Sequence, residues 1–223
     1  MTVDSTTVAF GDLPTEFPVF PLQGALLLPS GKLPLNIFEK RYLSMVEDAL
    51  AGQRVFGMIQ PDARYEDGVT GQALFGVGCL GRLSSFSETD DGRFLIAVNG
   101  LIRFDVVREL DLCRGYRRVQ ANFSSFSGDL DPPGDEMPQR AALLTALRQY
   151  FTANGFDANW EAIEDMKNPE LVVTLCMVCP FDPIEKQALI EAPTQEFRVD
   201  TLLTLLQMGS HGGSDERPGR ALS

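Results

Sequence analysis

The sequence has very little histidine and a shortage of basic residues. Its single histidine is His211, close to the C-terminus, so the preceding part of the chain cannot assemble a Ser-His-Asp triad, a Cys-His pair or a multi-histidine metal site. Nineteen Lys and Arg residues stand against 31 Asp and Glu residues, which gives a net charge of -12. This charge disfavours binding to nucleic acid and to anionic membrane surfaces.

Long apolar runs and a secretion signal are also missing. No stretch of about 18 apolar residues is present, and the first 11 residues have neither a basic segment nor an apolar core. The four cysteines are irregularly spaced, so we expect reduced thiols rather than a disulfide framework. With 44% apolar residues the chain can bury a sizeable core. We therefore expect a folded, soluble, cytoplasmic protein without a membrane partner.

Three short motifs suggest chemistry, and their context argues against it. Residues 76–81 match G-x-G-x-x-G, but a β pattern follows them where a dinucleotide fold needs a helix. Residues 30–32 (Ser-Gly-Lys) lack the other residues of a phosphate loop. Cys176 and Cys179 form a C-x-x-C without further zinc ligands, near the C-terminal end of a predicted helix. We expect no catalytic residue, metal or cofactor, hence no enzyme; a metal- or thiol-dependent small-ligand protein using this pair is the alternative.

Residues 17–50 organise the chain. Pro18 and Pro21 cannot donate to a central ladder, which predicts an edge or initiating strand here. Asn36 is the predicted N-cap of a helix, with Glu39 completing a capping box. Apolar side chains recur at helical spacing through the rest of the stretch, and Gly52 predicts its end.

The remaining patterns divide the chain into a β-rich half and a helical half. Residues 55–60, 74–87 and 116–126 read as strands, and Asp91-Gly92 predicts a hairpin turn. Asn99-Gly100 predicts a second turn between two short strands. After residue 138 the apolar period becomes helical, and Thr194 is a candidate cap of the last helix. The predicted divisions are a flexible N-terminus (1–12), a β-rich subdomain (13–127), a linker (128–138), a helical subdomain (139–209) and a disordered tail (210–223).

Several of these segments together resemble the amino-terminal, substrate-binding domain of Lon-type proteases, over residues 16–208. The resemblance is carried by residues 18–22 (Pro-Val-Phe-Pro-Leu), 28–31, 33–42 (Leu-Pro-Leu-Asn-Ile-Phe-Glu-Lys-Arg-Tyr), 76–78, 91–93, 100–104 and 185–191. Positions matching the family motifs, for which we expect structural roles, are Pro21, Leu22, Glu39, Gly78, Asp91, Gly92, Gly100 and Arg103.

The resemblance implies an α+β fold, in which a PUA-like pseudo-barrel with one embedded helix precedes a C-terminal helical bundle. It also implies a non-catalytic domain that binds polypeptides in protein quality control. The chain ends about where an ATPase module would begin and has no intact phosphate loop, so we expect neither ATPase nor peptidase activity. The expected partners are unfolded or hydrophobic polypeptides, with a protease or ATPase as a further partner; the oligomeric state does not follow from the sequence.

One surface is the candidate peptide-binding site. It comprises Leu33, Leu35, Ile37, Phe38, Arg41 and Tyr42, whose exposed apolar atoms could accept an extended chain. The alternative for the polar motif residues Glu39, Arg41, Asp91 and Arg103 is purely structural: capping the helix, forming the hairpin and pairing across the barrel edge. RNA binding by analogy with PUA domains is a further alternative. It conflicts with the net charge and would require a basic patch at Arg114, Arg117 and Arg118.

Overall fold

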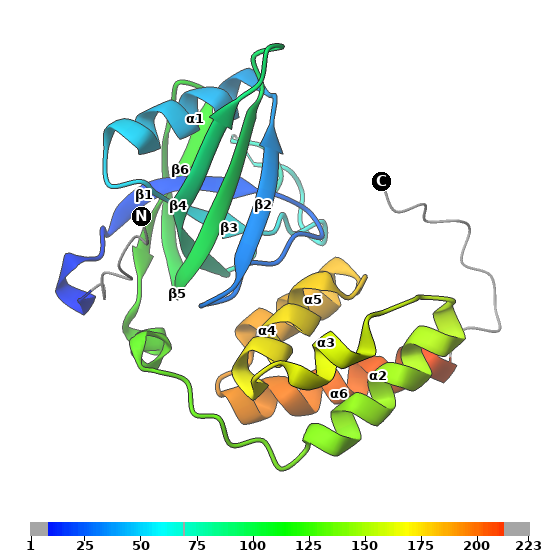
Figure 1. Ribbon diagram of the computed structural model, residues 1–223. Helices are drawn as coiled ribbons and strands as arrows, with labels where there is room; N and C mark the ends of the chain where they lie inside the picture. The colour runs from blue at the N-terminus through cyan, green and yellow to red at the C-terminus, as the bar shows by residue number, and fades with distance from the viewer. Residues whose placement is uncertain (1–8, 69, 212–223) are drawn as a thin grey trace.

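A computed structural model describes residues 9–68 and 70–211 of the chain. It shows a β-barrel with one helix against it and a group of helices packed below (Figure 1). The α+β class expected from the sequence is confirmed. The predicted flexible segment 1–12 and tail 210–223 lie mostly outside the described residues. Among the described residues of these two segments, Phe10–Asp12 forms a 3-10 turn.

Six strands form one sheet in the order β2-β5-β4-β3-β1-β6, and pairing of β5 with β6 closes the last five into a barrel. The strands are β1 (Glu16–Pro21), β2 (Lys32–Ile37), β3 (Val55–Ile59), β4 (Val77–Glu88), β5 (Phe94–Cys113) and β6 (Tyr116–Asn122). All strands but one are therefore paired on both sides along at least part of their length. Within the described residues β2 pairs with β5 alone, which leaves its other edge open.

The proline-flanked strand was predicted to be an edge or initiating strand; it is the first strand of the chain, and the edge alternative was wrong. β1 pairs with β6 through Glu16 to Val19 and with β3 from Val19 to Pro21, so it lies inside the sheet. The two ladders overlap only at Val19. Each proline therefore has a partner strand on one side only. A proline is tolerated here because its missing amide proton does not have to serve ladders on both sides.

The predicted turn at Asn99-Gly100 was also wrong. These residues lie within β5, a single strand of 20 residues that bends through bulges opposite β4. The amide of Gly100 donates to the carbonyl of Gly31, and the carbonyl of Gly100 accepts from Ser30. A side chain at Gly100 would overlap the carbonyl oxygen of Leu28. Glycine is needed here for a close backbone approach rather than for a turn.

The helix that follows β2 begins later than predicted. α1 (Lys40–Ala51) has Glu39 as its N-cap residue, without a side-chain capping bond, while Asn36 lies in β2. Asn36 pairs with Leu95 in the ladder, and this tertiary pairing overrides its capping preference. The predicted apolar face is otherwise confirmed, because the side chains of the helix that are buried are Tyr42, Met45, Val46 and Ala49.

The helical half follows an extended connection. After β6 come a short 3-10 segment, η2 (Ser124–Leu130), and then α2 (Arg140–Asn154), α3 (Trp160–Asp165), α4 (Asn168–Val178), α5 (Pro183–Glu191) and α6 (Gln195–His211). α5 begins with a complete capping box between Asp182 and Glu185, and Thr194 caps α6 through its hydroxyl. None of the helices in the described residues combines the length and apolar character needed to cross a membrane.

Two apolar clusters hold the molecule together. One fills the barrel and contains Phe17, Phe104 and Phe123, whose rings lie 5.0 to 6.4 Å apart between centroids. The other contains side chains from all six strands, from residues 26–28, and from α1, α2, α4, α5 and α6. This second cluster is thus shared by the barrel and the helices. The proposed boundaries at residues 128–138 remain a prediction about domain organisation.

Candidate functional site

The candidate peptide-binding surface centres on the open edge of β2 and the turn into α1. Lys32, Pro34 and Asn36 are exposed, while Leu33 and Leu35 alternate with them and are partly buried against the shared core. Phe38 lies between the strand and the helix, and 66% of its surface is exposed. An open strand edge next to an exposed aromatic ring is a geometry that can accept an extended chain.

Two residues of the predicted surface belong to the interior. Ile37 is 2% exposed, and Tyr42 is 5% exposed with its ring centroid 4.2 Å from that of Phe20. Burial raises the pKa of Tyr42. Neither side chain can contact a bound chain in this conformation, so the candidate surface is reduced to Leu33, Leu35, Phe38 and Arg41.

Arg41 lies in the first turn of α1, close in the chain to Phe38. Its guanidinium forms an ion pair with Glu39 at 2.9 Å and lies 4.5 Å from the centroid of the Tyr42 ring. Glu39 therefore forms this pair and makes no capping box. Both side chains of the pair are about half exposed, so the interaction contributes little to stability and leaves Arg41 accessible.

Four other motif positions lie in the barrel framework. Gly92 has φ +78° in the β4–β5 turn, which confirms the hairpin predicted there. Asp91 accepts a bond from Thr89 in this turn and pairs with Arg93; these contacts, the first above all, lower its pKa. Gly78 permits close packing, because a Cβ there would lie 2.6 Å from the ring of Phe104. The amide of Leu22, directly after Pro21 at the end of β1, donates to the carbonyl of Ile59.

Arg103 has a role that the sequence did not indicate. It is 4% exposed, and its guanidinium forms a two-bond pair with Asp129 of η2. The same group donates to the carbonyls of Ile190 and Ala192 at the end of α5, at 2.9 and 2.6 Å. Arg103 therefore joins the barrel to the helices instead of pairing across the barrel edge.

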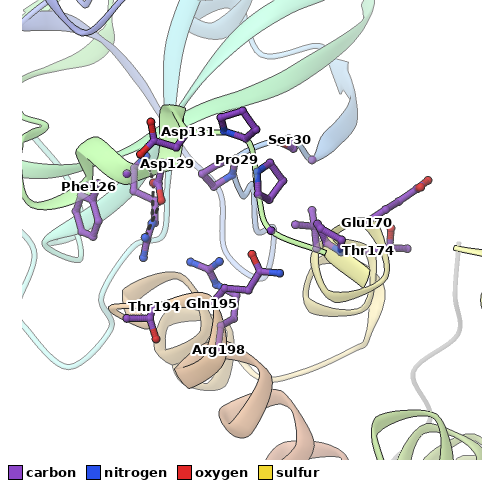
Figure 2. Close-up of a pocket in the computed structure, with 18 of the residues that line it drawn as sticks. Pro29, Ser30, Phe126, Asp129, Asp131, Glu170, Thr174, Thr194, Gln195 and Arg198 are labelled. Carbon is purple, nitrogen blue, oxygen red and sulfur yellow. Dashed lines mark hydrogen bonds and ion pairs between the residues drawn. The ribbon is translucent and has the colours of Figure 1, made fainter. Parts of the chain in front are cut away.

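A cavity of about 970 Å³ lies between the barrel and the helices (Figure 2). It is lined by the start of β2, by η2 and residues 131–135, by α4 and by the N-terminus of α6. In Figure 2 Arg198 extends from α6 toward the segment that carries Asp129 and Asp131. The sequence predicted the cap at Thr194 but gave no signal for this cavity, because its walls come from segments far apart in the chain.

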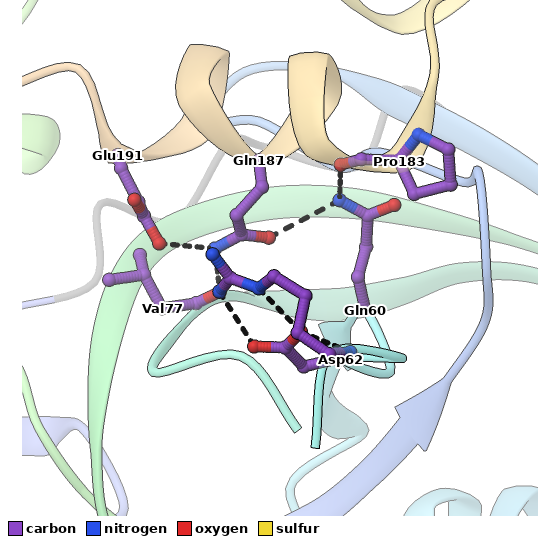
Figure 3. Close-up of polar contacts among 7 residues, drawn as sticks. Gln60, Asp62, Val77, Pro183, Gln187 and Glu191 are labelled. Atoms are coloured by element: carbon purple, nitrogen blue, oxygen red, sulfur yellow. Dashed lines mark hydrogen bonds and ion pairs between the residues drawn. The ribbon is translucent and has the colours of Figure 1, made fainter. Parts of the chain in front are cut away.

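A second polar cluster fixes α5 against the barrel (Figure 3). Gln60 donates to the carbonyl of Pro183 and to the side-chain oxygen of Gln187. Gln187 in turn donates to the carbonyl of Val77 and to Glu191. Gln60 and Gln187 are both 3% exposed, so their amide groups depend on these partners. The cluster explains the presence of Gln187 in the motif segment 185–191.

The C-x-x-C cysteines lie in the interior. Cys176 is in α4 and Cys179 is its C-cap residue, and both thiols are free and buried. Burial raises the pKa of each thiol to about 12. Neither is a thiolate near neutral pH. In residues 9–68 and 70–211 no group of three or more His, Cys, Asp and Glu side chains is placed to hold a metal ion.

The three arginines that would form an RNA-binding patch all have acidic partners. Arg114 pairs with Glu47 and Asp48, Arg117 with Glu109, and Arg118 with Glu16. Arg117 is also buried, at 6% exposure. These pairs neutralise the local charge that phosphate contacts would need.

The barrel with its embedded helix and the helical half joined to it at Arg103 define an α+β domain of the Lon amino-terminal type. A family model described as the ATP-dependent protease La (LON) substrate-binding domain matches residues 16–208. The chain belongs to this family.

Sequence relatives and solved structures agree with this assignment. Lon protease 2 of Myxococcus xanthus is 24% identical over 200 residues, and Lon protease 1 of Bdellovibrio bacteriovorus is 26% identical over 203 residues. These matches cover 87% and 85% of this chain but 24% of each relative, so the chain spans about a quarter of their length.

Two solved structures of Lon N-terminal domains share the fold. A Lon N-terminal domain protein from Xanthomonas campestris matches with a TM-score of 0.59 and 24% identity, over 86% of this chain and 98% of that one. The N-terminal domain of the Mycobacterium avium complex Lon protease matches with a TM-score of 0.58 and 14% identity, over 88% and 98%.

Proposed function

We propose that this domain binds extended, apolar segments of non-native polypeptides at the open edge of β2, with Phe38 as the main contact. The observation that carries the proposal is the exposure of Phe38, 66%, directly after a strand that is paired on one side in the described chain. Exposed aromatic rings beside unpaired backbone are costly in water and gain most from a bound chain.

Neighbouring side chains extend this surface. Leu95 of β5 lies opposite Asn36 in the ladder and is 47% exposed. Leu33 and Leu35 supply partly buried apolar area along the strand. Pro34 has no amide proton, which interrupts any ladder that a bound chain could form with the edge. Recognition therefore depends on apolar side chains more than on sequence-specific hydrogen bonds, which suits a receptor for varied unfolded clients.

The role in the cell that we propose is client recognition in protein quality control. The relatives are named Lon proteases, and the family model describes the substrate-binding domain of an ATP-dependent protease. An ATP-dependent protease is the partner that would act on the bound client. Four free cysteines favour a reducing compartment such as the cytoplasm.

The test is binding of a reduced, carboxymethylated model protein and of a peptide array to the wild type and to Phe38→Ser. We expect the variant to bind about thirtyfold more weakly, because an anchoring aromatic ring contributes on the order of 2 kcal/mol. Phe10→Ser is the matched control, since Phe10 is also exposed, at 47%, but lies in the separate 3-10 turn. Equal binding by wild type and Phe38→Ser would contradict the proposal.

A further inference from the structure

Arg198 of α6 is a buried charge without an ion-pair partner in the described part of the chain. It is 7% exposed, its Nε donates to the carbonyl of Leu189 at 2.9 Å, and its Nη2 is buried without a hydrogen-bond partner among the described residues. It forms no ion pair in that part of the chain, although a guanidinium has five N–H groups to satisfy. An unpaired buried charge is strongly destabilising, so this arrangement needs a partner from elsewhere.

Asp129, the carboxylate whose charge acts on Arg198, is already committed to another arginine. Both carboxylate oxygens of Asp129 accept from Arg103, and one also accepts from the Arg103 backbone amide at 3.0 Å. Arg103 and Arg198 therefore leave one positive charge uncompensated. Burial first and the charge of Arg103 second lower the pKa of Arg198, as expected for a cation that lacks its own anion.

The N-terminus of α6 opens onto the same cavity. Thr194 satisfies the amides of Phe197 and Arg198 through its hydroxyl and its carbonyl. No partner is present among the described residues for the amides of Gln195 and Glu196. Helix N-termini attract anions through such free amides and through the helix dipole. The unpaired guanidinium and the free amides thus lie at one end of the cavity, where Figure 2 shows Gln195 beside Arg198.

The rest of the cavity limits what kind of anion fits. One wall carries the apolar side chains of Val173, Met177 and Val178 from α4. The lining also contains two lysines and three carboxylates that are separate from the Arg103 pair, namely Lys32, Lys167, Asp131, Asp135 and Glu170. With Arg103, Arg198 and Asp129 the lining therefore carries four basic and four acidic groups, which leaves no surplus of positive charge for a polyanion such as a nucleotide. A single carboxylate attached to an apolar group matches both the positive end and the apolar wall.

We propose that this cavity is a binding site for a carboxylate that carries an apolar group, held by the guanidinium of Arg198 and the first-turn amides of α6. Two sources share this chemistry: the free C-terminal end of a polypeptide with an apolar last residue, and a small organic acid. The proposal does not rest on client binding at β2, because the cavity is formed by other elements, apart from the start of that strand.

The first experiment needs no variant. Binding of N-acetyl-leucine and of the peptide Ac-Ala-Ala-Leu to the full chain is compared by calorimetry with binding of their C-terminal amides. We expect the free acids to bind at least about tenfold more tightly than the amides, because amidation removes the negative charge and with it a charge-assisted interaction. Tighter binding of the peptide acid points to chain ends, and tighter binding of N-acetyl-leucine points to organic acids. Equal binding of acids and amides, or no binding of either acid at millimolar concentration, would overturn the proposal.

Variants then locate the site. Arg198→Gln is expected to abolish the preference for the acids, and Arg198→Lys to keep part of it, since lysine retains the charge but not the planar fork. Arg148→Gln is the control, because Arg148 is exposed on α2 outside this cavity. If Arg198→Gln does not fold, the backbone amide NMR signals of Gln195 and Glu196 in the wild type test the site instead. We expect these signals to shift on addition of the acids; unchanged signals, or tighter binding of inorganic phosphate, would contradict the assignment.

Discussion

Arg103 and Asp129 form a buried ion pair that closes the junction between the barrel and the helical half. The two bonds are each 2.8 Å long, and the side chains are 5% and 10% exposed. The Arg103 guanidinium also lies 4.4 Å from the centroid of the Phe126 ring. Its remaining donors satisfy carbonyls at the C-terminal end of α5, which have no partner within that helix. One residue of a barrel strand thus fixes η2 and α5 at once.

Replacing Arg103 is expected to be among the most destabilising single changes in this protein. Arg103→Met leaves Asp129 as an unpaired buried charge, and such a loss typically costs about 3–5 kcal/mol of unfolding free energy. Urea unfolding followed by circular dichroism measures it. Arg93→Met is the control, because the Arg93–Asp91 pair is half exposed and should contribute less than about 1 kcal/mol. The double variant Arg103→Met/Asp129→Leu should recover part of the loss; a loss below about 1 kcal/mol for Arg103→Met would show that the junction does not depend on this pair.

Gly100 is expected to tolerate no side chain. A methyl group at this position would overlap the carbonyl oxygen of Leu28, and backbone atoms cannot move aside as a flexible side chain can. Gly100→Ala should therefore lower the free energy of unfolding by about 2–3 kcal/mol or more. Gly76→Ala is the matched control, because nothing lies within 4 Å of a Cβ there and the change should be nearly neutral. Thermal melting of both variants distinguishes the two cases.

Local chemistry made part of this fold predictable from the sequence. The apolar face of α1 follows from helical spacing, and the hairpin turn follows from the positive φ that Gly92 adopts without strain. The cap of α6 at Thr194 is likewise encoded within four residues. In each case the residues that determine the local structure are neighbours in the chain, so the structure can be predicted from a short stretch of sequence.

Long-range pairing made the rest unpredictable. Asn36 and Asn99-Gly100 have strong local preferences for a cap and a turn, and ladder pairing with distant strands overrides both. Arg103 meets Asp129 across 26 positions of sequence. Arg198 carries no sequence pattern that distinguishes a buried arginine from an exposed one, so the charged end of the cavity became visible only in the structure.

Gln187 is expected to couple α5 to the barrel. Gln187→Leu removes the acceptor of Gln60 and the donor to the carbonyl of Val77, and buried groups without partners typically cost about 1–3 kcal/mol each. We expect a loss of about 2 kcal/mol or more in urea unfolding, together with faster hydrogen exchange in α5. Gln149→Leu on the exposed face of α2 is the control and should change little. Unchanged exchange in α5 would show that its other contacts are sufficient.

The thiols of Cys176 and Cys179 are expected to be unreactive in the folded state. Their pKa values of about 12 keep them protonated at pH 8, and burial denies a reagent access. Brief alkylation with iodoacetamide at pH 8, followed by mass spectrometry of peptides, should modify Cys113, which is partly exposed, well before either of them. In denaturant all of these thiols should react at similar rates. Rapid modification of Cys176 or Cys179 in the native protein would contradict this expectation and support a redox role for the pair.

The same pKa shifts predict how stability depends on pH. In the unfolded chain these thiols lose their protons at an ordinary value of 9.0, whereas in the folded protein they keep them up to about pH 12. Above pH 9 the unfolded state therefore binds fewer protons than the folded state, and the free energy of unfolding falls as pH rises, by up to about 1.4 kcal/mol per pH unit for each thiol. The double variant Cys176→Ala/Cys179→Ala starts less stable because of its cavities, but lacks this decline. Urea denaturation at pH values from 8 to 10.5 should show that the difference in unfolding free energy between wild type and variant becomes smaller as pH rises. A constant difference would contradict the assigned pKa shifts.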